Sequence, residues 1–117
     1  RYSDAAASAA GNFARQCGMP VTVVSVAHED FSLARQKEVE ETAARISRLL
    51  SQGGITARPQ VVRGRPASAI VEAAQQEKAD VIVVGSHGRS GLERVLIGSV
   101  SERVIGHADC AVLVVKA

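Results

Sequence analysis

Apolar and polar residues follow two different periods along the chain, and these periods predict strands and helices in turn. Short runs rich in Val and Ile predict β-strands, and apolar positions three and four residues apart predict amphipathic helices. The predicted helices cover residues 4–17, 31–52, 66–78 and 100–107. The predicted strands cover residues 21–26, 56–62, 80–85 and 111–115. This alternation indicates an α/β protein with a parallel sheet covered by helices.

The same pattern predicts which faces of the elements are buried. The apolar positions of the first helix share one face, which we expect to face the core: Ala6, Ala10, Phe13 and Cys17. The strand over 21–26 is apolar on both faces, which is typical of burial on both sides of a parallel sheet. Pro59 marks the strand over 56–62 as an edge strand, because proline cannot donate a hydrogen bond to the ladder.

The predicted order begins with a helix, whereas a doubly wound α/β domain begins with a strand at the centre of its sheet. A sheet that lacks its middle strand leaves open edges inside the core. We therefore expect residues 1–117 to form a single domain with a Rossmann-like, doubly wound parallel sheet. We expect its first strand to lie before residue 1 in the intact protein.

Composition and charge narrow the function classes. The formal net charge is only +2 and the chain has no Trp, which argues against a nucleic-acid binder with a basic face and stacking aromatics. No apolar run approaches the roughly 20 residues of a membrane span. The two cysteines, Cys17 and Cys110, lie far apart and suit a reducing compartment better than a disulfide framework. We therefore expect a cytoplasmic protein without nucleic-acid or membrane partners.

The candidate chemistry lies in the glycine-containing stretch over 85–101, which follows the strongest predicted strand. Open α/β sheets bind ligands beyond the carboxyl ends of their strands, and glycines let backbone amides approach a phosphate closely. At the end of this stretch Ser99 and Glu102 form a capping-box pattern before the last helix. The start of that helix has two interpretations, an anion site and a simple capped end, and both can be true together. The glycines serve either phosphate binding or tight turns.

Other side chains in this stretch leave similar alternatives. His87 and Arg89 either contact phosphate or lie in solvent. The sequence contains no Walker A lysine pattern, no Cys/His cluster with metal spacing and no carboxylate pair placed to hold Mg²⁺. Binding is thus better supported than catalysis, and we expect slow hydrolysis at most.

Three segments together resemble the universal stress protein family: residues 80–88, 98–105 and 110–115. Members of that family that bind ATP share a pattern of Gly, two residues, Gly, nine residues and Gly-Ser, which Gly85, Gly88, Gly98 and Ser99 match without a gap. The resemblance implies a fold of the adenine nucleotide alpha hydrolase type. The chain departs from the family at Ala111, where Pro is frequent. The family's aspartate near the base corresponds to a position before residue 1.

The resemblance also implies roles for individual residues. Val26 would lie against adenine, and the other predicted site residues would lie along the ribose and phosphates: Val84, Gly85, His87, Gly88, Arg89, Gly98, Ser99, Val100 and Ser101. It implies ATP as ligand, accompanied by Mg²⁺ or Mn²⁺, in a nucleotide-responsive stress regulator with little or no hydrolysis. It further implies a homodimer that pairs through Val112–Val115. The competing hypothesis is a dimeric interaction module of the same fold that binds no nucleotide.

Overall fold

The computed structural model describes residues 2–27, 30–85 and 99–115, and the bounds of its elements follow the predicted ones closely. The helices are α1 (Tyr2–Cys17), α2 (Leu33–Gln52), α3 (Pro66–Glu77) and α4 (Ser99–His107). The strands are β1 (Val21–Ala27), β2 (Ala57–Arg63), β3 (Val81–Gly85) and β4 (Ala111–Val115). Each bound lies within two residues of the sequence-based prediction. The predicted α/β class is confirmed.

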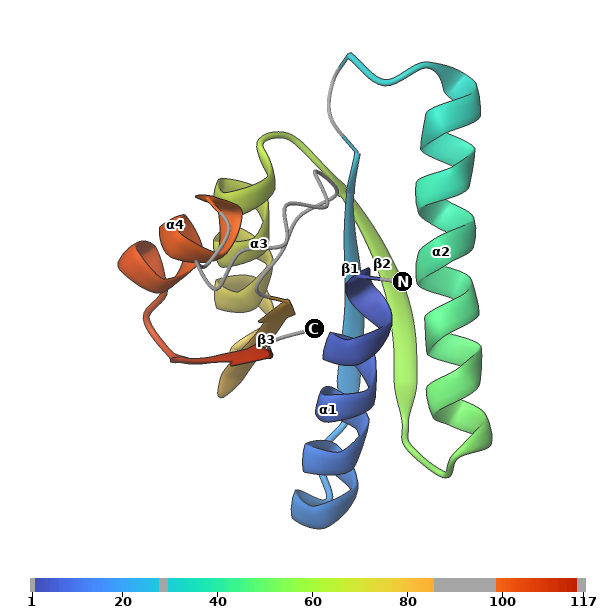
Figure 1. The fold of residues 1–117 in the computed structure, drawn as a ribbon, viewed down its shortest axis with the longest axis vertical. Coiled ribbons are helices and arrows are strands. Elements are labelled where there is room, and N and C mark those ends of the chain that lie inside the picture. Colours follow the sequence, from blue (N-terminus) through green and yellow to red (C-terminus); the bar gives the residue numbers. More distant parts are fainter. Residues whose placement is uncertain (1, 28–29, 86–98, 116–117) are drawn as a thin grey trace.

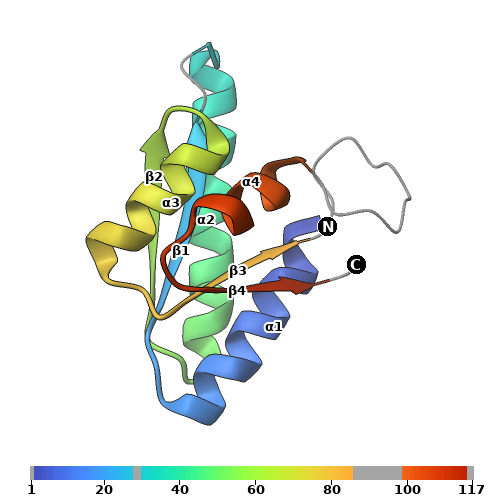
Figure 2. The ribbon, with the colours of Figure 1, turned by 90° about the vertical axis from the view of Figure 1, so that its left-hand side faces the viewer.

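The described strands form two separate two-stranded parallel sheets. β1 pairs with β2, with Val21 opposite Ala57 and Ala27 opposite Arg63. β3 pairs with β4, with Val81 opposite Ala111. Figure 2 shows the two pairs running in different directions, β1 and β2 upright and β3 and β4 across them.

Helices cover both faces of these sheets. α2 and α3 lie on opposite sides of the β1–β2 pair (Figure 1). The two faces of β1 are distinguished by their contacts, because Val21 and Val23 pack towards the cluster formed with α2, whereas Thr22 contacts Glu77 of α3. α1 contacts α2 and strands of both sheets, and α3 packs against α4.

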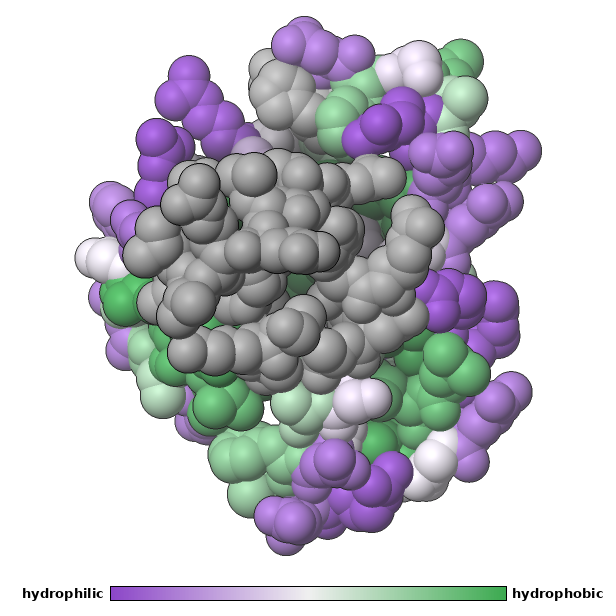
Figure 3. Space-filling model, viewed as in Figure 1, coloured by the Kyte–Doolittle hydropathy of each residue, from purple (hydrophilic) through white to green (hydrophobic). Residues whose placement is uncertain are grey.

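Two apolar clusters hold the layers together. The first joins α1, α2 and the turn before β2, and consists of Ala14, Ile46, Leu50 and Ile55. The second joins α3, β3 and α4, and consists of Val71, Ile82 and Val104, of which Val104 is fully buried. The charged side chains of α2 face outward, as its sequence pattern predicts, and they appear along the outer side of that helix in Figure 3.

Local sequence signals explain where the helices begin and end. The Ser32 side chain accepts a hydrogen bond from the backbone N–H of Arg35 at 3.2 Å and so caps α2. Pro66 occupies the first turn of α3, where its missing N–H costs nothing. Gly53 follows the last turn of α2, and its N–H donates to the carbonyls of Leu49 and Leu50.

Two expectations about burial were wrong. Cys17 is exposed and Phe13 is 37% exposed, because α1 turns Gly11 and Ala14 towards the core instead. The close approach of α1 to α2 at Gly11 rotates the helix away from the predicted face. The strand β1 is also less buried than predicted: its residues from 21 to 26 are all partly exposed, and only Ala27 is buried.

Candidate functional site

Five of the ten predicted site residues lie where β3 ends and α4 begins. Val84 and Gly85 are the last residues of β3, and Ser99, Val100 and Ser101 form the first turn of α4. Val26 lies near the end of β1, in the other sheet. The remaining four lie outside the described residues: His87, Gly88, Arg89 and Gly98.

The second apolar cluster brings the end of β3 and the start of α4 together. Val84 of β3 and Val100 of α4 both pack against the cluster that contains Ile82 and Val104. Fixing both elements on one cluster determines where the intervening stretch leaves the sheet and where it enters the helix. The two ends of the glycine-rich stretch are thus anchored at the carboxyl edge of the β3–β4 sheet.

The first turn of α4 has the electrostatic character of an anion site. The leading N–H groups of a helix have no partner within the helix, and the helix dipole places partial positive charge there. Ser101 is 5% exposed and so belongs to the packed base of this turn. α4 is nine residues long and is held by Val104, which is 0% exposed. The amino end of a packed helix is suited to holding a phosphate without rearranging.

Val26 is held by the β1–β2 ladder. It lies opposite Val62, and the alternation of side chains puts it on the same face of β1 as Thr22, the face that α3 covers. The turn after β2 closes this edge: the N–H of Gly64 donates to the carbonyl of Ala27 at 3.2 Å, with Gly64 at a φ of +131°. That positive φ favours glycine at this turn.

Contacts at the start of α2 were not foreseen from the sequence. The guanidinium of Arg35 lies over the Phe31 ring, 4.6 Å from its centroid. Arg63 Nη2, at the end of β2, donates to Gln36 Oε1 at 2.8 Å. The spacing of four residues between Phe31 and Arg35 is a signal for their contact, but nothing local signals a pair 27 residues apart.

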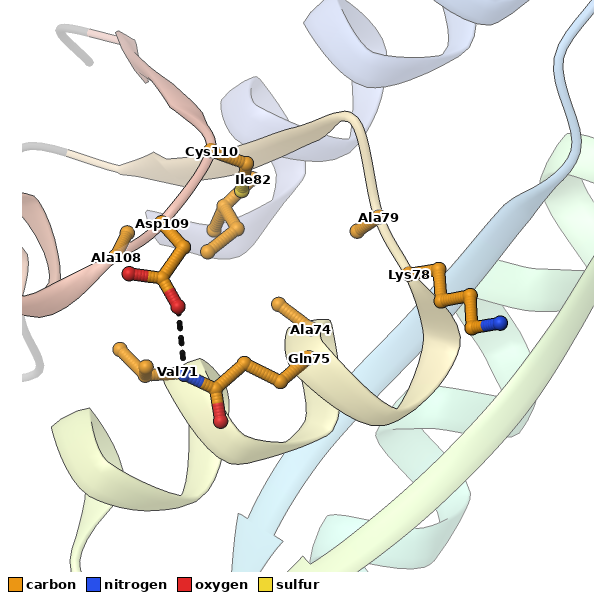
Figure 4. Close-up of a pocket in the computed structure, with 9 residues that line it drawn as sticks. All are labelled: Val71, Ala74, Gln75, Lys78, Ala79, Ile82, Ala108, Asp109 and Cys110. Atoms are coloured by element: carbon orange, nitrogen blue, oxygen red, sulfur yellow. Dashed lines mark hydrogen bonds between the residues drawn. The ribbon is translucent and has the colours of Figure 1, made fainter.

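A cavity of about 240 Å³ lies at the opposite end of the β3–β4 sheet. It is lined mainly by small and apolar side chains from the end of α3, the start of β3 and the turn before β4 (Figure 4). Gln75 Nε2 donates to Asp109 Oδ2 at 3.0 Å beside it. The cavity is smaller than the roughly 300–1,000 Å³ of typical ligand pockets, and it lies at the amino ends of the strands rather than the carboxyl ends. Its position and size separate it from the candidate site.

A polar contact on the β1–β2 sheet ties α3 to both of its strands. Arg58 Nη2 lies 2.5 Å from Glu77 Oε1, and Thr22 Oγ1 lies 3.2 Å from the same oxygen. The hydrogen bond from Arg58 lowers the pKa of Glu77 from its ordinary value of 4.5, against the opposing effect of desolvation. This group joins the amino-terminal half of the sheet to α3, and its role is structural.

Within the described ranges, no three His, Cys, Asp or Glu side chains are grouped so that they could hold a metal ion. None of the helices described is both long enough and apolar enough to cross a bilayer. Cys17 and Cys110 are not joined in a disulfide.

Comparison with known proteins identifies relatives over nearly the whole chain. Residues 1–116 match the model of the universal stress protein family. The chain is 44% identical over 81 residues to universal stress protein MJ0531 of Methanocaldococcus jannaschii, a match that covers 69% of this chain and 48% of that protein. The chain spans about half the length of the curated relatives it matches.

Solved structures of similar proteins share the fold. MJ0577 of the same organism superposes with a TM-score of 0.83 at 29% identity, over 99% of this chain and 88% of that chain. A universal stress protein solved in complex with cAMP superposes with a TM-score of 0.71 at 28% identity, over 95% of this chain and 84% of that chain.

Proposed function

The chain belongs to the universal stress protein family, and from that premise we propose that it binds an adenine nucleotide, ATP by preference. The phosphates would lie between the carboxyl end of β3 and the first turn of α4. The observation that carries this proposal is the shared packing of Val84 and Val100 on one buried cluster, which holds both ends of the glycine-rich stretch at one edge of the sheet. The similarity to a protein solved with cAMP supports the class of ligand.

Specific roles follow from the positions of the residues. The backbone of Gly85, Gly88 and Gly98 and the amides and hydroxyls from Ser99 to Ser101 would bind phosphate oxygens. His87 and Arg89 would contact the phosphates from the stretch between them. Val84 would lie under the ribose, and Val26 would form an apolar wall for adenine. A Mg²⁺ or Mn²⁺ ion would be carried mainly by the phosphate oxygens themselves.

We propose binding with little or no hydrolysis, in a cytoplasmic, nucleotide-responsive regulator. Phosphoryl transfer to water needs a group that orients the attacking water and usually a metal held by protein ligands. The sequence supplies no Walker A lysine pattern for such chemistry.

We also propose that the protein is a homodimer paired along β4. In the described part of the chain β4 has one strand partner, β3, so its outer edge is open to another strand. Leu113 of β4 is 40% exposed, which leaves an apolar side chain beside that edge. Open apolar edges of this kind are often covered by self-association.

Isothermal titration calorimetry with ATP tests the proposed binding. We expect saturable binding by the wild-type chain and a loss of about tenfold or more in affinity for Gly88→Val, because a side chain there blocks close approach of the backbone to phosphate. Gly106→Ala is the matched control: it lies in the last turn of α4, and an added Cβ meets no atom within 4 Å. Its affinity should equal that of the wild type.

The competing interaction module predicts different results. No binding at millimolar ATP would overturn the nucleotide proposal. If Gly88→Val unfolded the chain in urea titrations, the glycine would serve a turn, and Gly98→Ala would then be measured in its place. Steady release of phosphate from ATP by the wild type, abolished in Gly88→Val, would show that the protein is an ATPase. That result would contradict the proposal of little or no hydrolysis.

A further inference from the structure

The side-chain amide of Gln36, near the start of α2, is hydrogen-bonded at both of its ends. Its Nε2 donates to the carbonyl of Phe31 at 3.3 Å, and its Oε1 accepts from Arg63 Nη2 at 2.8 Å. A guanidinium only donates and a carbonyl only accepts, so this orientation of the amide is the one in which both contacts are hydrogen bonds. Gln36 therefore bridges the chain before α2 and the end of β2.

The two segments joined by this bridge flank the end of β1. Arg63 lies opposite Ala27, the last residue of β1, and the N–H of Gly64 donates to the carbonyl of Ala27 at 3.2 Å. Phe31 follows Ala27 by four residues along the chain. Figure 1 shows the start of α2 at the same end of the sheet as the ends of β1 and β2. The bridge therefore lies at the carboxyl edge of the β1–β2 sheet, close in sequence to Val26.

The contacts of Phe31 and Gln36 divide into local and distant ones. The guanidinium of Arg35 lies 4.6 Å from the centroid of the Phe31 ring, and the backbone N–H of Arg35 donates to Ser32 Oγ at 3.2 Å. These local contacts tie Phe31 to α2 itself. The bond between Arg63 and Gln36 instead spans 27 residues and ties the start of α2 to the sheet. Loss of the Gln36 side chain should therefore loosen the chain before α2 relative to the end of β1.

We propose that Gln36 is a positioning residue for the base end of the nucleotide site, an inference that rests on the proposed function. In that function Val26 forms the wall for adenine, whereas the phosphates lie between β3 and α4. The phosphate end belongs to the other sheet and is held by the second apolar cluster. The bridge through Gln36 joins β2 and the start of α2. It therefore contributes to the affinity for the adenosine part of the ligand and not to the affinity for the triphosphate part.

Calorimetric titrations with ATP and with inorganic tripolyphosphate test this division. Gln36→Met removes both hydrogen bonds while keeping a side chain of similar length. We expect it to weaken ATP binding by roughly fivefold, the net contribution of about one hydrogen bond, and to leave tripolyphosphate binding unchanged. Gln52→Met, the same change at the exposed last residue of α2, is the matched control and should bind both ligands like the wild type. Urea titrations establish that both variants are folded.

An NMR measurement without nucleotide tests the bridge itself. The backbone N–H of Ser32 shares a peptide group with the Phe31 carbonyl, so its chemical shift reports the hydrogen bond from Gln36. Gln36→Met should move this signal and Gln52→Met should not. Gln36→Glu keeps an oxygen for Arg63 but loses the donor to Phe31. It should also move the Ser32 signal, and it takes the place of Gln36→Met in the titrations if that variant does not fold.

The outcomes separate this inference from the proposed function. A wild-type chain that binds no ATP overturns the proposed function and the inference with it. The inference alone is overturned if the wild type binds ATP and the Gln36 variant binds it equally well, or loses tripolyphosphate to the same extent. A wild type that binds ATP but not tripolyphosphate also overturns it, because the two ends of the site are then not independent. So does a Ser32 signal that neither Gln36 variant moves.

Discussion

The carboxylate of Glu77, in the last turn of α3, accepts a hydrogen bond from Arg58 of β2, with 2.5 Å between Oε1 and Nη2. Thr22 of β1 donates to the same oxygen at 3.2 Å. One carboxylate oxygen therefore links α3 to both strands of the β1–β2 sheet. Because the bond from Arg58 favours the charged carboxylate, the pKa of Glu77 is lower in the folded protein than its ordinary value of 4.5.

This linkage predicts a loss of stability in acid. A carboxyl group with a lower pKa in the folded state binds its proton more readily when the chain unfolds. Its contribution is therefore present above pH 4.5 and is lost as the pH falls through the folded-state pKa. The free energy of unfolding, measured by urea titrations from neutral pH into acid, should fall less steeply for Glu77→Gln than for the wild type. Glu72→Gln, an exposed carboxylate on the same helix, should keep the wild-type decline. Equal curves for wild type and Glu77→Gln would contradict the prediction.

The helix contact at Gly11 predicts a different kind of loss. A Cβ on Gly11 would lie 2.9 Å from Leu50 Cδ2 and 3.3 Å from Ile55 Cδ1, inside a buried cluster. Overpacking a core costs about 1–3 kcal/mol, and Ala gains up to about 1 kcal/mol over Gly in helix propensity. Gly11→Ala should therefore lower the free energy of unfolding by about 1–2 kcal/mol. Gly106→Ala meets no atom within 4 Å and should instead gain up to about 1 kcal/mol from helix propensity. Chemical denaturation of both variants measures these changes in the free energy of unfolding. A Gly11→Ala variant as stable as the wild type would show that α1 packs less closely against α2.

Val104 provides a test of the cluster beneath the candidate site. It is 0% exposed and packs with Val71 and Ile82. Val104→Ala should cost about 2 kcal/mol, through lost burial and the cavity left behind. Ile105→Ala, at the neighbouring 44% exposed position, should cost under about 1 kcal/mol. If ATP binds as proposed, Val104→Ala should also weaken it in calorimetry, because Val104 holds α4 in place, whereas Ile105→Ala should not.

The features that were predicted well from the sequence depend on local patterns. Helices and strands lie within two residues of their predicted bounds, because periodicity, Pro66 and Gly53 act on neighbouring residues. The exposure of Cys17 was not predictable, since it depends on how closely Gly11 lets α1 approach α2. The pairing of Arg58 with Glu77 likewise depends on where two separate elements meet.

The candidate site was predictable in part for the same reason. Glycine spacing identified the stretch, and the apolar cluster under Val84 and Val100 shows why its two ends meet at one edge. The sequence pattern does not reveal that shared packing, because the two residues belong to different elements. The roles of His87, Gly88, Arg89 and Gly98 stay predictions, since these residues lie outside the described ranges.

The open edge of β4 leads to a prediction about assembly. If two chains pair along this edge, Leu113, which is 40% exposed, lies at the contact. Leu113→Lys should then shift the protein to monomer in sedimentation velocity over a range of protein concentrations, because a lysine on an edge strand opposes pairing by charge and desolvation. Ile105→Lys is the matched control: it replaces an apolar residue of similar exposure on α4, away from the strand edge. It should leave the dimer intact. A wild-type chain that stays monomeric at every concentration would overturn the proposed dimer. An Ile105→Lys variant that dissociates while Leu113→Lys does not would place the interface away from β4.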